Sequence, residues 1–477
     1  MNPDLEPYPA YKDSGVPWLG DIPAHWQQSP GRACFVETKT PNVGMQETTV
    51  LSLSYGQIVV RPPEKLHGLV PASFETYQII EPYDIVIRPT DLQNDWVSLR
   101  TGLARTRGII TSAYMRLRTK DSLAPEYGHL LLHAYDLKKV FYGLGSGLRQ
   151  NLSWRDFKYL PCLVPSPGEQ AAIVRFLDYV DRRIRRYIRA KKKLIALLEE
   201  QKQAFIQRAV TRGLDPNVRL KPSGVEWLGE MPEQWQVVSL GVAADSIQTG
   251  PFGSQLHASE YVTGGIPVIN PSHMRDGRIQ FDPAIAISKR KARELERHAL
   301  QAGDVVMARR GELGRCALVC EAEDGWLCGT GSLRIRPKSQ LFVSEYLVLL
   351  LGSPGVRDML SLSSIGATMN NLNAGMVGQL RLPRPHLQEQ RQVVEHINSE
   401  LGKIQSALFG AQREIDLIRE YRTCLIADVV TGKLDVREAA ANLPDEADVP
   451  EDWDADGTEE ESDEDLAQAD GEADDED

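Results

Sequence analysis

The chain has 477 residues, 42% hydrophobic and 25% charged, a composition ordinary for a soluble protein of two to four domains. Residues 444–477 hold nineteen acidic and no basic side chains, and they account for the net charge of −12. The remainder has 54 basic and 47 acidic residues, a mild excess compatible with a polyanionic partner. No apolar stretch is long enough to span a bilayer, and no signal-peptide pattern opens the chain, which excludes a membrane-protein class. We therefore expect a cytoplasmic location.

The chain opens on a segment that returns later. Residues 14–27, SGVPWLGDIPAHWQ, recur as residues 223–236, SGVEWLGEMPEQWQ, with nine of fourteen residues identical. The offset is 209. A second pair, residues 165–215 and 385–435, begins with PSPGEQ or PHLQEQ and ends with VTRGLD or VTGKLD at an offset of 220. Such a long period indicates a duplicated unit, each copy a whole domain with its connector.

Each copy begins with a head of mixed structure. In the first head, residues 83–87 and 113–117 have the short apolar runs typical of strands, and residues 125–133 predict a helix. In the second head, residues 304–307 repeat the first strand and residues 344–350 repeat the helix. The two heads share a plan but differ in their residues.

A long helix follows each head, at about 167–212 and 387–432. Apolar residues spaced by three, four or seven form a seam along each helix, which needs a partner helix. We expect the two helices to pair antiparallel within the chain, and an intermolecular coiled coil is the alternative. The seam residues are Ile184, Ile188, Ile195, Leu198, Phe205, Ile404, Leu408, Ile415, Ile418 and Leu425.

The predicted fold class is α+β: two mixed α/β domains joined by two long antiparallel coiled-coil helices, with a pseudo-twofold internal repeat. We expect domain boundaries that follow the repeat. The expected segments are a first recognition head at 1–164, a central helical spacer at 165–220, a second head at 221–384, a distal helical spacer at 385–440 and an acidic disordered tail at 441–477.

Motifs for catalysis are missing from the sequence. It has no GxxxxGK[ST], HExxH or GxSxG pattern, and no glycine-rich fingerprint opening a βαβ unit. Residues 270–273, NPSH, partly match the NPPY-type motif of amino-methyltransferases, but a turn is favoured because the third and fourth residues differ. These absences favour a binding or scaffolding role over an enzyme.

No metal site is predicted. His129 and His133 are four apart, as ligands on one helix face would be, but flanking leucines favour core histidines. Cys316, Cys320 and Cys328 form the one cysteine cluster, and it lacks a convincing fourth ligand. Reduced thiols are the favoured interpretation.

The order head, long helix, head, long helix resembles the specificity subunit of Type I restriction–modification enzymes. The resemblance covers nearly all of residues 12–437. Each head opens with Ser-Gly-Val-x-Trp-Leu-Gly and closes through Gln150-Asn151-Leu152 or Asn370-Asn371-Leu372, a proline-containing loop and a Glu-Gln helix start. The second head also contains residues 249–256 (TGPFGSQL), 265–270 (GIPVIN) and 303–311 (GDVVMARRG).

The resemblance implies two target-recognition domains, each reading half of a bipartite double-stranded DNA sequence, with the helices setting the gap between the halves. Because the heads differ, we expect an asymmetric target. The family also implies a non-catalytic chain that holds two methyltransferase subunits and can be joined by restriction–translocase subunits. S-adenosylmethionine, ATP and magnesium are then expected on those partners only, with no cofactor in this chain.

Candidate DNA contacts are the loop residues that carry hydrogen-bonding groups. Arginine can pair with guanine and asparagine or glutamine with adenine, but ordinary solvated loop residues are the alternative for every position. The candidates are Arg88, Thr90, Gln93, Asn94, Arg100, Arg105, Arg107, Gln255, His257, Asn270, Ser272, His273, Arg309 and Arg310.

The densest basic run lies at residues 182–193 on the first long helix. It could follow phosphates, dock an acidic partner, or be a solvated helix face. Two rival functions remain open at this point. One is a fused restriction–modification enzyme that acts alone, and the other is a coiled-coil interaction protein in which the acidic tail is the functional part.

Overall fold

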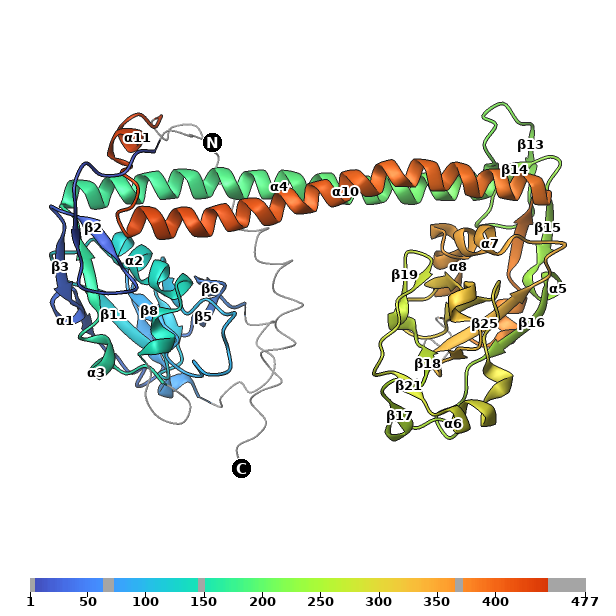
Figure 1. The fold of residues 1–477 in the computed structure, drawn as a ribbon, viewed down its shortest axis with the longest axis horizontal. Helices are drawn as coiled ribbons and strands as arrows, with labels where there is room; N and C mark the ends of the chain where they lie inside the picture. The colour runs from blue at the N-terminus through green and yellow to red at the C-terminus, as the bar shows by residue number, and fades with distance from the viewer. Residues whose placement is uncertain (1–4, 63–72, 145–150, 365–371, 445–477) are drawn as a thin grey trace. The chain divides into compact units, whose positions relative to one another are not determined.

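The computed structural model describes residues 5–62, 73–144, 151–364 and 372–444. Two compact units divide the chain, Met1–Arg189 with Ile415–Asp477, and Ala190–Glu414. Each unit combines one head, the beginning of one long helix and the end of the other (Figure 1). Of the sequence predictions, the acidic tail from residue 445 onward and the positions Gln150, Asn370 and Asn371 lie outside the described residues.

The first head is built on an antiparallel four-stranded sheet in the order β4 (Phe35–Glu37), β11 (Met115–Thr119), β8 (Ile85–Ile87), β9 (Thr101–Leu103). Four two-stranded pairs join it: β1 (Tyr11–Asp13) with β2 (Asp21–Pro23), β3 (Gln27–Pro30) with β12 (Pro161–Val164), β5 (Leu51–Ser54) with β6 (Gln57–Val60), and β7 (Gln78–Ile80) with β10 (Gly108–Ile110). Its helices are α1 (Gly31–Cys34), α2 (Pro125–Leu137), α3 (Trp154–Phe157) and, after the long helices, α11 (Arg437–Ala441).

The second head repeats this sheet as β16 (Ala244–Thr249), β25 (Ser332–Pro337), β22 (Val305–Ala308), β23 (Cys316–Leu318). The pairs β13 (Leu220–Pro222) with β14 (Glu230–Pro232) and β15 (Gln236–Ser239) with β26 (Arg381–Arg384) repeat two pairs of the first head. New here are a sheet of β17 (Tyr261–Val262), β21 (Ala286–Ile287), β18 (Ile266–Ile269) and β24 (Leu327–Cys328), and the pair β19 (Met274–Arg275) with β20 (Arg278–Ile279). The helices are α5 (Leu240–Ala243), α6 (Lys289–Glu294), α7 (Ser344–Leu351), α8 (Pro354–Ser364) and α9 (Ala374–Gly378).

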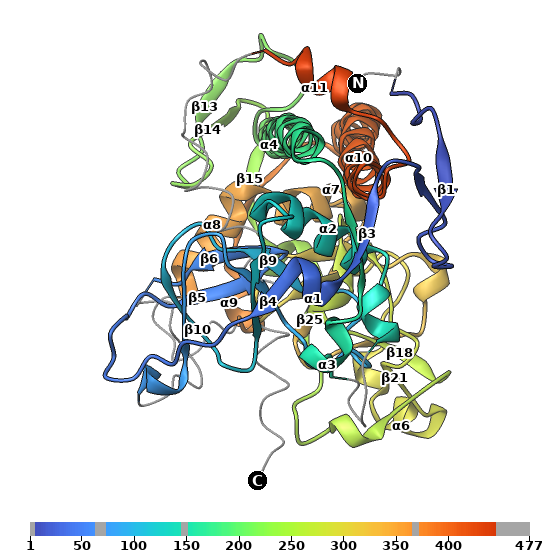
Figure 2. The ribbon, with the colours of Figure 1, turned by 90° about the vertical axis from the view of Figure 1, so that its left-hand side faces the viewer.

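The long helices are α4 (Pro167–Arg212) and α10 (Leu387–Val430), close to the predicted bounds. In the first unit the start of α4 lies beside the end of α10, as the end-on view in Figure 2 shows, and Arg422 pairs with Asp181 at 2.5 Å. In the second unit the end of α4 packs on the start of α10, and the Phe205 and His396 rings lie 5.6 Å apart. In both units the start of one long helix packs beside the end of the other. The predicted antiparallel pairing within one chain is therefore confirmed.

The predicted seam faces inward in both units. Ile184, Ile415, Ile418 and Leu425 are buried, and the other six seam residues are half-buried. On the first head, α2 lies between the sheet and the helix pair, and α7 takes this place on the second (Figure 1). The α+β prediction and the internal repeat are therefore both confirmed.

One joint in each unit ties the helix ends to the opening segment of the head. Trp26 is fully buried, and its indole N–H donates to Glu169 in the first turn of α4 at 3.2 Å. Gly432, just after α10, leaves no room for a side chain, because a Cβ there would lie 3.1 Å from the Trp26 ring and 2.4 Å from Pro23. The repeated Pro-x-x-Trp segment thus packs on both helix ends at once.

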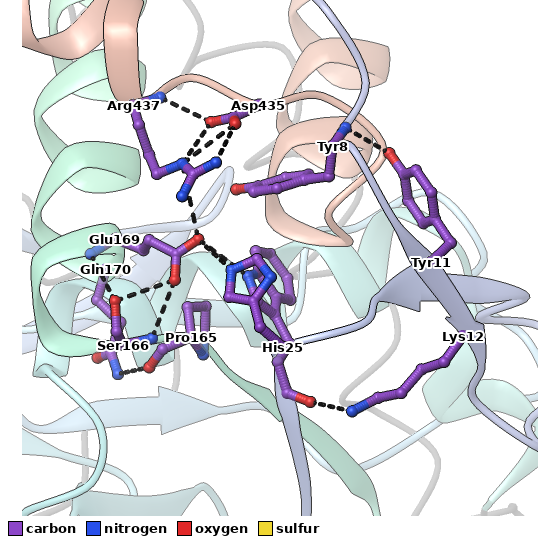
Figure 3. Close-up of polar contacts among 11 residues, drawn as sticks. Tyr8, Tyr11, Lys12, His25, Pro165, Ser166, Glu169, Gln170, Asp435 and Arg437 are labelled. Atoms are coloured by element: carbon purple, nitrogen blue, oxygen red, sulfur yellow. Dashed lines mark hydrogen bonds and ion pairs between the residues drawn. The ribbon is translucent and has the colours of Figure 1, made fainter.

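The joint around Glu169 contains further contacts (Figure 3). The carboxylate accepts from the Ser166 hydroxyl at 3.0 Å and contacts His25 at 2.9 Å, and Arg437 lies 4.0 Å away. Burial raises the pKa of Glu169, but the hydrogen bonds from His25, Trp26 and Ser166 outweigh it and hold this pKa below its ordinary value. An ionised carboxylate also suits the start of a helix.

The second unit repeats the joint. Trp235 is fully buried and donates to Glu389 at 2.9 Å, in the first turn of α10. Gly213, just after α4, lies against the Trp235 ring, where a Cβ would approach to 3.2 Å.

The adjacent glutamines repeat as well. Gln170 donates to the carbonyls of Ser122 and Pro165, and Gln390 donates to those of Leu341 and Pro385. The tryptophan, glutamate and glutamine that are identical in the two repeats therefore make equivalent contacts in both units.

The joint can be tested at Glu389, which is half-buried. Glu389→Leu keeps the volume but leaves the buried indole N–H of Trp235 without its acceptor, which should lower the free energy of unfolding by about 1–3 kcal/mol. Glu389→Gln keeps an acceptor oxygen and should cost less than about 1 kcal/mol. Urea denaturation of the full chain measures both, and equal losses for the two variants would contradict the role given to this hydrogen bond.

Candidate nucleic-acid interface

The loop that connects β8 to β9, residues 88–100, holds five of the predicted contacts. Arg100 organises it from inside: its guanidinium donates to the carbonyls of Thr90 at 2.6 Å, Asp91 at 3.0 Å and Asp95 at 2.6 Å. Its Nε donates to the Tyr142 hydroxyl at 3.0 Å. These bonds fix the backbone on both sides of the loop tip.

Arg100 itself is therefore not a base contact. Its side chain is completely buried and its guanidinium donates to groups of the protein. The prediction that Arg100 contacts DNA is wrong for this conformation, because a guanidinium enclosed by loop carbonyls cannot also reach a base edge. It is a positioning residue.

Asp95 shapes the tip of the same loop. Its carboxylate accepts from the backbone N–H groups of Val97 at 3.2 Å and Ser98 at 2.9 Å, and it lies 3.5 Å from Arg88. Burial raises the pKa of Asp95, but the bonds from Ser98 and the charges of Arg100 and Arg88 outweigh it and hold this pKa low. The turn is thus stabilised by an ionised carboxylate.

The remaining candidates of the first head lie on the surface. Gln93 and Asn94 are exposed at the loop tip, and Asn94 also donates to Asp91 at 2.9 Å. Arg105 is exposed, whereas half-exposed Arg107 pairs with Glu47 at 3.3 Å and Glu81 at 3.1 Å. Arg88 and Thr90 are half-buried at the base of the loop. The structure therefore brings Gln93 and Asn94 together at one tip.

In the second head the corresponding loop, between β22 and β23, is much shorter. Arg310 is exposed, but Arg309 is only 7% exposed. The carbonyl of Arg309 accepts from Leu372, as that of Pro89 accepts from Leu152 in the first head, both at 2.9 Å. The Arg309 prediction is thus not supported by its burial, and Arg310 is the better-placed contact.

A second loop of this head carries the NPSH segment. It forms a single helical turn in which Ser272 is exposed, whereas His273 is 7% exposed and burial lowers its pKa. The half-buried Asn270 side chain packs against Gly329, where a Cβ would lie 2.1 Å from its Oδ1. Of these three candidates, only Ser272 is fully presented to a ligand, and the expectation for buried His273 is corrected.

Gln255 and His257 lie on the loop before β17. Gln255 is half-buried, and its side-chain oxygen accepts from the Phe252 N–H at 3.0 Å. His257 is exposed, and its backbone N–H donates to Glu260 at 2.9 Å. The loop is therefore ordered by its own side chains, with His257 at its surface.

Each head has a buried carboxylate that the sequence did not single out. Asp84 accepts from Arg118 at 2.8 Å and pairs with Arg116. In the second head Asp304 accepts twice from Arg336, at 2.7 and 2.8 Å. The alternating arginines of β11 and β25 are the sequence pattern from which these clusters could have been predicted. These clusters stiffen the sheet strand that leads into each loop.

The basic run on α4 has partners within its unit. Arg185 pairs with Asp181 at 2.7 Å, and Arg183 donates to the Tyr179 hydroxyl at 3.1 Å. With its amide oriented to satisfy its neighbours, Gln57 in the β5–β6 hairpin also accepts from Arg185 at 2.8 Å. Part of the run therefore stabilises the helix and its contact with the head.

His129 and His133, which the sequence analysis favoured as core histidines, lie four residues apart on α2. The rings of His129 and His133 stack at 5.8 Å, and burial lowers their pKa values to about 3 and about 4, so both are neutral. No cluster of three or more metal-ligating side chains occurs among the residues that the structure describes. None of the described helices is sufficiently long and apolar to cross a bilayer.

Comparison with known proteins finds similar proteins of one kind. A model described as Type I restriction modification DNA specificity domain matches residues 232–405. The MjaVIII specificity subunit of Methanocaldococcus jannaschii is 22% identical over 363 residues, which cover 74% of this chain and 81% of that protein. The EcoKI specificity subunit of Escherichia coli is 21% identical over 213 residues, 43% of this chain and 44% of that protein.

Residues 232–405 belong to the Type I restriction modification DNA specificity domain family, and both relatives are specificity subunits of Type I restriction enzymes. A chain of a solved type I R–M system, from work on its complex assembly and conformational transition, has the same fold, with a TM-score of 0.63 at 16% identity. The match covers 87% of this chain and 99% of that chain. The resemblance drawn from the sequence is confirmed, and the chain is a DNA sequence-specificity subunit.

The organising role of Arg100 in this specificity subunit gives a testable consequence. Arg100→Ala should release the loop, increase hydrogen exchange across residues 88–100, and reduce discrimination at the half-site read by the first head by at least about tenfold. Discrimination at the other half-site should be unchanged. Exposed Arg105→Ala is the control and should leave the exchange of the loop unchanged. Wild-type discrimination at both half-sites in Arg100→Ala would refute the positioning role.

Proposed function

We propose that the chain reads an asymmetric, bipartite DNA sequence, with one half-site for each head. The observation that carries this proposal is the contrast between frame and loops. Both heads repeat the indole-to-glutamate hydrogen bond, Trp26 to Glu169 and Trp235 to Glu389, whereas the loops at 88–100 and 309–315 differ in length and in most side chains. Different side chains at equivalent places in a common frame are suited to different base sequences.

We further propose that the repeated frame holds two copies of one methyltransferase subunit. Grooves at equivalent places support this. One, of about 560 Å³, lies between the start of α2 and the first turns of α4 and is lined by Glu126, Val174 and Asp178, among others. The other, of about 630 Å³, lies between the start of α7 and the first turns of α10, with Glu345, Val394 and Asn398 at the matching positions. Two equivalent surfaces suit two identical partners.

Catalysis in this proposal belongs to the partners. The sequence lacks phosphate-cradling and nucleophile-elbow motifs, so we assign S-adenosylmethionine to the methyltransferase subunits. ATP and magnesium are assigned to restriction–translocase subunits where these join. We place the assembly in the cytoplasm, where the DNA it acts on lies. This chain then contributes recognition and geometry.

Methylation mapping of host DNA, with and without this chain, tests the proposal. A single asymmetric motif made of two short sequences separated by a gap should disappear when the chain is deleted, because neither half can be read without its head. A continuous or palindromic motif that depends on the chain would refute the two-reader assignment. Methylation of DNA by the purified chain with S-adenosylmethionine alone would refute its non-catalytic role.

A further inference from the structure

The tip of the β8–β9 loop presents an apolar surface on an otherwise polar turn. Val97 is 90% exposed, more than any other large apolar side chain in the described part of the chain. Trp96, beside it, is 54% exposed. Exposure of apolar side chains to water is unfavourable by roughly 25 cal/mol for each Å² of apolar surface. A partner that covers this tip would therefore gain binding free energy.

This tip is rigidly held. The Trp96 ring stacks on Tyr142 with centroids 4.4 Å apart and an interplanar angle of 24°, and its N–H donates to the Gln93 carbonyl at 3.0 Å. The Asp95 carboxylate binds the N–H of Val97, and buried Arg100 holds the Asp95 carbonyl from inside. The conformation is thus set before a ligand binds, which reduces the entropy lost on binding.

Amide side chains lie on the same turn. Gln93 and Asn94 are both exposed, and an amide can bind the N6 and N7 atoms of adenine in the major groove. The thymine paired with that adenine displays its C5-methyl group on the same groove edge. An amide and an apolar side chain on one rigid turn therefore match the two features that mark an A·T pair.

Positive charge lies at the base of the loop. The Lys139 ammonium lies 5.0 Å from the centre of the Tyr142 ring, the ring on which Trp96 stacks. Arg88 is the first residue of the loop, and its side chain lies beside that of Asp95. Cations at these places suit contacts with phosphates on either side of the base pair that the tip would read.

We infer that Val97 is a specificity-determining residue that contacts the C5-methyl group of a thymine, in an A·T pair whose adenine is bound by Gln93 or Asn94. This inference rests on the proposed function, because it assigns base chemistry to one of the two reading loops. It predicts at least one A·T pair in the half-site of the first head, read in the major groove.

The test uses the full chain assembled with its partner subunits and the target DNA found by methylation mapping. Each thymine of the half-sites is replaced in turn by deoxyuridine, which lacks the methyl group. One such replacement should weaken binding by the wild type about threefold to tenfold, the scale of one or two buried methyl groups. Val97→Ala should weaken binding to the natural target similarly, and that deoxyuridine should then have no further effect.

Val242→Ala is the matched control, because Val242 is an exposed valine of the second head, at 61%. It should keep the full wild-type response to deoxyuridine. The inference is overturned if Val97→Ala binds as the wild type does and keeps the deoxyuridine response, or if its defect lies in loading of the partner subunits. In either case, sequence-specific binding by the wild type still supports the proposed function. If the wild-type assembly shows no sequence preference, the proposed function itself fails.

Discussion

The hydrogen bond from a buried indole to a helix-start glutamate is the contact on which each unit depends. Trp26 with Glu169, and Trp235 with Glu389, each join the opening segment of a head to the first turn of one long helix. The same indole rings lie against the glycines, Gly432 and Gly213, that follow the other helix. Three segments far apart in the sequence therefore meet at one side chain, and the head is held at a fixed place on its helix pair.

The frame explains why the rest of each head can vary. The joint fixes the opening segment of each head to the helix ends. The segments after β8 and β22 take no part in it. One became a thirteen-residue loop with a buried arginine, and the other a short turn that carries Arg310. A recognition protein benefits from this separation, because new loop residues change the bases read without loosening the support.

The sequence predicted the frame well because the frame is local and repeated. The tryptophans recur at an offset of 209 and the Glu-Gln helix starts at an offset of 220, so the duplicated frame was visible in the sequence, although the hydrogen bond that joins them was not predicted. The seam of apolar residues predicted the helix pair for the same reason, since its spacing is a property of one helix.

The loops were predicted less well, and the reason is physical. Arg100 looks like a phosphate or guanine ligand in the sequence, but it is buried because three backbone carbonyls and Tyr142 surround it, which is a tertiary arrangement. His273 and Arg309 were misjudged in the same way. The converse error concerns Val97, which a search for polar ligands passes over although it is the most exposed apolar side chain described.

If the proposed function is right, the two heads on one frame read their half-sites independently. Methylation mapping with a chain in which Gln93 and Asn94 are both replaced by alanine measures this independence. Only one half of the bipartite motif should become degenerate, while the other half and the gap stay the same. A motif in which both halves change together, or in which the gap changes, would contradict it.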